Sequence, residues 1–262
     1  MTTVPIVASH EHRHSLDTSA IGFISFIQLV PERVGDSTVY PFSIPAVQAL
    51  RERLPLHPRA TFFVGDNGSG KSTILEAIAV AAGFNPEGGT TNFSFSTRSS
   101  ESTLHRSIRL ARTERRPRTG YFLRAESFFN VATNIEELDS VPALAPPVID
   151  SYGSRSLHEQ SHGEAFMALV RHRFGTDGLY ILDEPDAALS MGTQGELLRA
   201  LERLVTLNGS QIIVATHSLV LPALKDCTIY EFSAGGIKAT PYQETETYRL
   251  ARTFLDSQAN ES

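Results

Sequence analysis

One segment, Gly65-Asp-Asn-Gly-Ser-Gly-Lys-Ser72, constrains the fold of this chain more than any other. It fits the pattern G-x-x-x-x-G-K-[ST], follows the apolar run 61–64 and precedes a helical pattern over residues 72–82. Glycines let backbone N–H groups wrap a phosphate chain, and the helix that begins there directs its positive end at the same phosphates. The segment therefore predicts a nucleotide-phosphate site between a strand and a helix.

The lysine and the last serine of this segment carry its chemistry. Lys71 is expected to reach the β- and γ-phosphates of a nucleotide, and the Ser72 hydroxyl is expected to bind Mg²⁺. The expected nucleotide-binding residues are Gly65, Asp66, Asn67, Gly68, Ser69, Gly70, Lys71, Ser72 and Thr73.

Strands and helices alternate through the second half of the chain. The apolar runs 179–182 and 212–215 are typical of strands buried on both faces, and helical patterns cover 164–174 and 197–205. The two strands end 33 positions apart, at Asp183 and Thr216, which is the length of one β-α-β unit. We therefore predict an α/β fold with a mainly parallel sheet flanked by helices.

The length of 262 residues predicts one domain, over residues 20–256, with flexible tails at 1–19 and 257–262. The domain is expected to carry an antiparallel β patch at about 90–130 and a small helical subdomain at about 131–175. Within the patch, segments 108–113 and 121–126 alternate and flank a turn cluster at 115–120. This arrangement predicts a hairpin.

Charge and cysteine content exclude several classes of protein. The net charge of −6 argues against coating nucleic acid through bulk charge, although the segment Arg98–Arg118 has a local charge of +5. That segment could bind a phosphate backbone, face solvent or contact an acidic partner. Cys227 is the single cysteine, which favours a reducing compartment, and no apolar stretch reaches the roughly 20 residues of a membrane span. We therefore expect a cytoplasmic protein without direct membrane insertion.

A second motif, Leu179-Tyr-Ile-Leu-Asp-Glu-Pro185, places two adjacent carboxylates at the end of a buried strand. In open α/β sheets this end of a strand faces the ligand, and successive residues point to opposite faces. Asp183 is expected to hold Mg²⁺ through its water shell, and Glu184 to polarise the attacking water as a general base. The alternative is a surface turn that caps the strand.

Together the two motifs resemble those of the ABC-type P-loop ATPase superfamily. More narrowly, segments such as 122–129 and 157–164 look like those of small stand-alone bacterial AAA/ABC-like predicted ATPases. The resemblance implies a signature at Ser161, His162, Gly163 and Glu164, where His162 and Glu164 depart from the usual Leu-Ser-Gly-Gly-Gln pattern. The same four residues also fit a helix capping box.

The resemblance implies roles for three further places. His217 is similar to the switch histidine that contacts the γ-phosphate and orients Glu184. The residues similar to the D-loop, which contacts the partner subunit, are Asp186, Ala187, Ala188, Leu189 and Ser190. The glutamine of the family's Q-loop is missing from this chain, and Glu126 is the nearest candidate to replace it. Tyr40 is a candidate for stacking on adenine. For both residues, the alternative is a packing role.

The resemblance implies ATP hydrolysis with Mg²⁺ by a head-to-tail homodimer that serves an unknown protein partner. The interval of 112 residues between Lys71 and Asp183 leaves no room for the coiled-coil arm of chromosome-maintenance ATPases. Three alternatives stay open: the ATP-binding subunit of a transporter whose membrane chains are separate, a P-loop kinase, and a nucleic-acid-linked or defence ATPase that uses segment 98–118.

Overall fold

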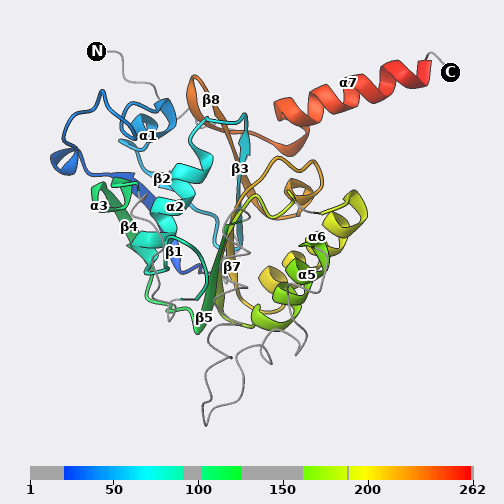
Figure 1. The fold of residues 1–262 in the computed structure, drawn as a ribbon, viewed down its shortest axis with the longest axis horizontal. Coiled ribbons are helices and arrows are strands. Elements are labelled where there is room, and N and C mark those ends of the chain that lie inside the picture. The colour runs from blue at the N-terminus through cyan, green and yellow to red at the C-terminus, as the bar shows by residue number, and fades with distance from the viewer. Residues whose placement is uncertain (1–20, 91–101, 125–161, 188, 261–262) are drawn as a thin grey trace, which may run out of the picture.

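The computed structural model describes residues 21–90, 102–124, 162–187 and 189–260. Its strands form two sheets, a large one and a small one, and Figure 1 shows helices beside them and the C-terminal helix extending away from them. The strands are β1 (Ile24–Leu29), β2 (Leu54–Pro55), β3 (Ala60–Gly65), β4 (Ile108–Arg112), β5 (Thr119–Arg124), β6 (Gly178–Asp183), β7 (Gln211–Ala215), β8 (Thr228–Ser233) and β9 (Gly236–Ala239). The α-helices are α1 (Pro45–Ala49), α2 (Lys71–Ala82), α3 (Leu104–Ser107), α5 (His162–Arg173), α6 (Met191–Thr206) and α7 (Glu246–Asn260). Short 3-10 turns are η1 (Pro31–Arg33), η4 (Leu221–Ala223) and η5 (Tyr242–Glu244).

The large sheet has six strands in the order β5-β6-β7-β3-β8-β9, and all neighbours are parallel except β8 and β9. Strands β6 and β7 pair in parallel with α6 between them in the chain, so the predicted β-α-β unit is confirmed. The predicted α/β fold class, with a mainly parallel sheet and an antiparallel patch, is confirmed as well.

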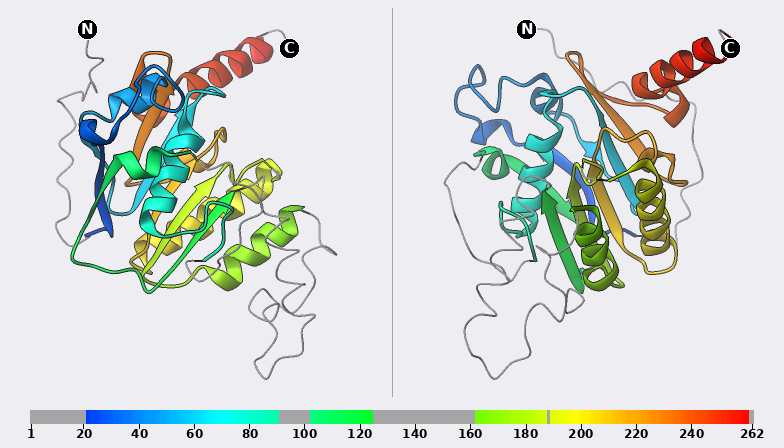
Figure 2. Two further views of the ribbon diagram at one scale, coloured as in Figure 1. Left: turned by 60° about the vertical axis from the view of Figure 1, so that its left-hand side comes forward. Right: turned by 45° about the vertical axis from the view of Figure 1, so that its right-hand side comes forward.

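Two hydrophobic cores cover the two faces of this sheet. Along β6, Tyr180 and Leu182 pack with α5 and α6, whereas Ile181 packs with α2 on the opposite face. Figure 2 shows the same separation, with α2 on one side of the sheet and α5 and α6 on the other. Because both faces are covered, every residue of β6 is buried, as its continuous apolar run predicts.

The small sheet corrects the predicted hairpin. Strand β4 pairs antiparallel with β1, in the order β2-β1-β4, whereas β5 pairs in parallel with β6 in the large sheet. Tyr121, Phe122 and Leu123 are all buried, which requires cover on both faces. Gly120 lies in β5, paired with Leu179, and not in a turn. An added Cβ there would lie 2.8 Å from both the Leu179 carbonyl oxygen and the Phe84 ring.

Several predicted features lie outside the described residues: the tail 1–19, Glu126 and most of the helical subdomain before residue 162. At the other end, α7 continues to Asn260 and so includes residues 257–260, which the sequence assigns to a tail. Within the described ranges, no helix combines the length and the apolar character needed to cross a bilayer.

The side chain of Gln211 joins the two sheets. Its Oε1 accepts hydrogen bonds from the backbone N–H groups of Phe23 and Ile24, at 2.8 and 2.9 Å. Its Nε2 donates to the carbonyl oxygens of Ile24 and His57, at 2.8 and 2.9 Å. Gln211 is fully buried, so these four backbone groups have no ready access to water.

Gln211→Leu is therefore expected to lower the free energy of unfolding by about 3 kcal/mol, because it leaves several buried backbone groups without partners. Urea denaturation followed by circular dichroism measures the change. Gln243→Leu, at an exposed position of η5, is the matched control. Equal unfolding midpoints for the two variants would contradict the role of Gln211.

Candidate active site

The loop between β3 and α2 has the backbone conformation that its glycines permit. Gly65, Gly68 and Gly70 have φ angles of 124°, 74° and 98°, in the left-handed region that other residues rarely adopt. At Gly65 an added Cβ would also collide with the backbone oxygen of Phe232. The loop therefore turns tightly at the carboxyl end of β3, and α2 begins directly after it at Lys71.

Lys71 closes this loop from within. The side-chain Nζ of Lys71, which is buried, donates hydrogen bonds to the carbonyl oxygens of Gly65 and Asp66, at 2.8 and 2.7 Å. Burial lowers the pKa of the Lys71 ammonium, and the negative charges of Glu184 and Asp183 partly oppose that shift. An ammonium group held at the loop in this way can exchange a carbonyl oxygen for a phosphate oxygen.

Ser72 and Asp183 come together although they are 111 residues apart. The Ser72 hydroxyl donates to Asp183 Oδ1 at 2.9 Å, where the first turn of α2 meets the carboxyl end of β6. A hydroxyl and a carboxylate are oxygen ligands of the kind that Mg²⁺ prefers, so the donor set fits this ion. The described residues contain no group of three acidic, histidine or cysteine side chains that could hold a metal. An ion at this pair would therefore take its remaining ligands from phosphate oxygens and water.

Glu184 and His217 form a second pair at the same edge of the sheet. Glu184 Oε1 lies 3.6 Å from His217 Nε2, and about two fifths of each side chain is exposed. The backbone N–H of Glu184 donates to the Ala215 carbonyl at 2.9 Å, and the φ angle of Glu184 is 51°. Such a conformation is unfavourable for a non-glycine residue, and it directs the two neighbouring acids apart: Asp183 to Ser72 and Glu184 to His217.

A cavity of about 170 Å³ opens beside the loop and joins these groups. Tyr40 lies at its rim, with the hydroxyl 3.4 Å from Thr73 Oγ1 and with 66% of the residue exposed. Ile44 also lines the cavity, and no motif in the sequence marks this apolar residue as part of the site. The cavity is lined by Tyr40, Ile44, Asn67, Gly68, Gly70, Lys71, Ser72, Thr73 and Glu184.

The residues similar to the D-loop have partners within this chain. Asp186 accepts a hydrogen bond from the Thr216 hydroxyl, and Ser190 caps α6 by accepting from the Thr193 N–H at 3.2 Å. Leu189 packs into the core, and Ala187 is exposed. Ala188 lies outside the described residues.

The signature residues are only partly described. Helix α5 begins at His162, whose side chain is not described, and Ser161 lies outside the described residues. Gly163 is half-buried and Glu164 is exposed, in the first turn of α5. Neither is among the described residues that line the cavity at the loop.

Several arginines of segment 98–118 have structural partners instead of forming a free basic face. Arg112 donates to the last carbonyls of α2, at Ala81 and Ala82. Arg115 donates to Asp177 at 2.8 Å and lies over the Phe23 ring, 4.7 Å from its centroid. These contacts weaken the alternative that segment 98–118 binds nucleic acid. The pairing of β4 with β1 and of β5 with β6, in place of the predicted hairpin, weakens it further.

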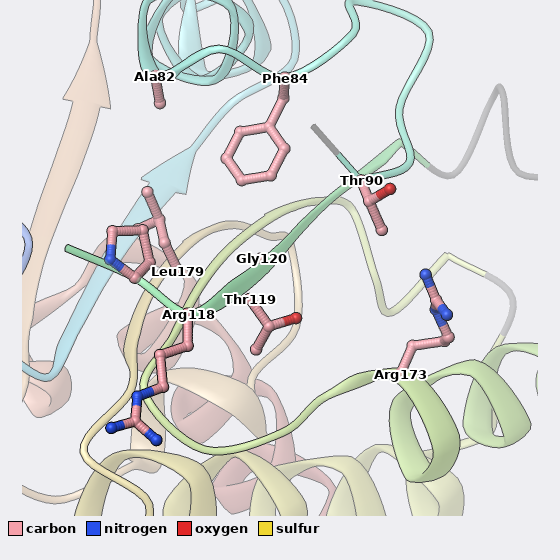
Figure 3. A pocket seen from close by; sticks show the side chains of 9 residues that line it. Ala82, Phe84, Thr90, Arg118, Thr119, Gly120, Arg173 and Leu179 are labelled. Atoms are coloured by element: carbon pink, nitrogen blue, oxygen red, sulfur yellow. The ribbon is translucent and has the colours of Figure 1, made fainter. Parts of the chain in front are cut away.

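A second cavity, of about 220 Å³, lies at the amino ends of β5 and β6, away from the site described above. Phe84 and Leu179 form an apolar part of its wall, and Arg118 and Arg173 lie on separate sides of it (Figure 3). Arg118 Nε is 3.8 Å from Asp177, so it is already near an acidic side chain.

Comparisons with known proteins give one family match, and it includes the loop 65–72. The family model of an AAA domain matches residues 49–137. The matched range includes the loop 65–72 and covers less than half of the chain. This match agrees with the resemblance to the ABC-type P-loop ATPase superfamily. No curated protein matches the chain.

Three solved structures are among those to which this chain is similar. A metal-chelate type ABC transporter in an inward-facing conformation is 14% identical, with a TM-score of 0.47. The match covers 87% of this chain and 88% of the transporter chain. The SMC head domain from Thermotoga maritima is 17% identical, with coverages of 84% and 98% and a TM-score of 0.41. The ATP-binding cassette MJ0796, a dimer bound to ADP and Pi, is 15% identical, with coverages of 71% and 86% and a TM-score of 0.42. At these identities and TM-scores, no activity or assembly is transferred from these proteins.

Proposed function

We propose that this chain binds ATP with Mg²⁺ and hydrolyses it to ADP and phosphate. The observation that carries the proposal is the convergence of three features at one edge of the sheet. These are the Lys71 ammonium in its loop, the Ser72–Asp183 pair, and the Glu184–His217 pair. All three lie at the carboxyl ends of β3, β6 and β7, where open α/β sheets bind their ligands.

The loop and α2 hold the phosphates in this proposal. Backbone N–H groups of residues 66–72 and the Lys71 ammonium bind the β- and γ-phosphates, at the positive end of the helix. Ser72 and Asp183 would hold Mg²⁺, directly and through its water shell, and the ion would supply positive charge to offset that of the phosphates. Tyr40, exposed at the rim next to Thr73, contacts the adenine.

Glu184 and His217 act on the water and on the γ-phosphate. The Glu184 carboxylate accepts a proton from the water as the water oxygen bonds to the γ-phosphorus. The bond from that phosphorus to the bridging oxygen breaks, and ADP leaves with the electron pair. His217 orients Glu184 and donates a hydrogen bond to the γ-phosphate.

The active form in this proposal contains two copies. Ser161, His162, Gly163 and Glu164 of one copy cover the nucleotide held by the other, and Asp186, Ala187, Ala188, Leu189 and Ser190 border the same interface. One observation supports this arrangement: Tyr40, at the rim of the cavity, is 66% exposed, so a second copy can approach the nucleotide there. ATP favours closure because its γ-phosphate adds contacts only in the closed state.

Phosphate release by the wild-type protein tests the proposal. We expect multiple turnovers with ATP and Mg²⁺, and none after EDTA is added in excess of Mg²⁺, because the phosphates then lose the charge of the ion. Transfer of the γ-phosphate to a small molecule instead of to water would favour the kinase alternative.

A further inference from the structure

Gln194, in the first turn of α6, bridges two segments that border the candidate active site. Its Nε2 donates to the Leu189 carbonyl at 3.1 Å, and its Oε1 accepts from the Ser218 hydroxyl at 2.7 Å. Leu189 belongs to the loop after β6, whereas Ser218 follows β7 directly after His217. One side-chain amide thus connects the loop that follows Glu184 with the turn that carries His217.

The Ser218 hydroxyl is fixed by the contacts that surround it. Besides donating to Gln194, it accepts from the N–H groups of Val220 and Leu221, at 2.9 and 3.1 Å. Ser218 is buried, so its orientation depends on protein partners and not on bulk water. A primary amide is well suited to this place, because it can accept from Ser218 and donate to a carbonyl at the same time.

A second connection holds the other side of His217. The Thr216 hydroxyl donates to Asp186 and accepts from the Ser218 N–H at 2.9 Å, and Thr216 itself is fully buried. The residues on both sides of His217 are therefore anchored to the loop 185–190. His217 itself is exposed, with its Nε2 3.6 Å from Glu184 Oε1, so its place depends on these anchors.

We infer that Gln194 is a positioning residue for ATP hydrolysis, which holds the turn 216–218 so that His217 stays within reach of Glu184. This inference rests on the proposed function and adds a residue that no motif indicates. The side-chain hydrogen bonds of Gln194 go to Leu189 and Ser218, and it acts on His217 through Ser218. Displacements of about 1 Å at reacting groups can lower rates by one to two orders of magnitude, so the effect is measurable.

Gln194→Ala tests the inference through steady-state ATP hydrolysis. We expect kcat to fall about tenfold and KM for ATP to stay within about twofold of the wild-type value, because the phosphate-binding loop is untouched. Gln194→Glu keeps the acceptor for Ser218 and loses the donor to Leu189. Its kcat is therefore expected to lie between that of the wild type and that of Gln194→Ala. Gln243→Ala, in the exposed turn η5, is the matched control.

The same substitution in a His217→Ala background separates positioning from general destabilisation. If Gln194 acts through His217, Gln194→Ala changes the residual rate of that background by less than about twofold. A wild-type kcat for Gln194→Ala would overturn the inference, and so would an equal tenfold loss in both backgrounds. Turnover by the wild-type protein, and its loss in Glu184→Gln, report separately on the proposed function.

Discussion

Glu184→Gln is expected to lower the rate of ATP hydrolysis by about 10²- to 10⁴-fold, because an amide cannot accept the proton of the attacking water. The substitution keeps the size of the side chain and a polar atom near His217, whose Nε2 lies 3.6 Å from Glu184 Oε1. ATP binding is therefore expected to remain, since in the proposed arrangement the Glu184 carboxylate acts on the water and is not among the main ligands of the γ-phosphate. Single-turnover phosphate release measures the rate, and fluorescence of a labelled ATP analogue measures binding.

Glu202→Gln is the matched control for this substitution, because Glu202 lies exposed on α6. It removes the same charge and is expected to hydrolyse ATP at the wild-type rate. Wild-type hydrolysis by Glu184→Gln itself would contradict the assignment of the general base.

The same variant tests the two-copy arrangement, because it holds ATP without converting it. We expect light scattering to give the mass of a dimer at saturating MgATP and the mass of a monomer without nucleotide. A monomer under both conditions would remove the head-to-tail dimer from the proposal. The role of Glu184 as general base would still be tested by the rate of hydrolysis.

Lys71→Ala is expected to abolish measurable ATP binding, with a dissociation constant raised at least about 100-fold. The variant loses the buried cation that binds the phosphates in the proposal, and it also loses the two hydrogen bonds from Lys71 Nζ to the Gly65 and Asp66 carbonyls. Isothermal titration with MgATP measures binding.

Lys238→Ala controls for the loss of a lysine, since Lys238 is exposed on β9. Circular dichroism shows whether Lys71→Ala remains folded. Wild-type affinity in a folded Lys71→Ala protein would contradict the location of the phosphate site.

The local part of the site could be predicted from the sequence. The glycines, Lys71 and Ser72 form one continuous segment, and the conformation of that segment depends on its own residues. Asp183 could be placed near Ser72 from the sequence. Asp183 ends one buried strand, Ser72 follows another, and the carboxyl ends of parallel strands lie at the same edge of a sheet. The pattern of buried strands around 179–182 and 212–215 supplied that geometry.

The pairing of strands could not be predicted in the same way. Segments 108–113 and 121–126 are neighbours in the chain, and an alternating pattern does not specify the partner of a strand. β4 instead pairs with β1 and β5 with β6, because the triplet Tyr121-Phe-Leu123 requires cover on both faces. The choice depends on the burial of the whole fold and not on the turn between the two segments.

Gln194 and Gln211 show a similar limit for polar side chains. Each forms hydrogen bonds to groups that only the folded chain brings together, such as Gln211 with Phe23 and Gln194 with Ser218. A single glutamine in an amphipathic helix or at the start of a strand has no pattern that marks this role.

The measurement that tests the central claim most directly is the fate of the γ-phosphate of ATP. Wild-type protein in excess over γ-labelled ATP is mixed with Mg²⁺, and the label is followed in ATP, in free phosphate and in any other product. We predict that the label moves to free phosphate in the wild type and stays in protein-bound ATP in Glu184→Gln. Label that stays in ATP in the wild type, or passes to an acceptor other than water, would contradict hydrolysis at this site.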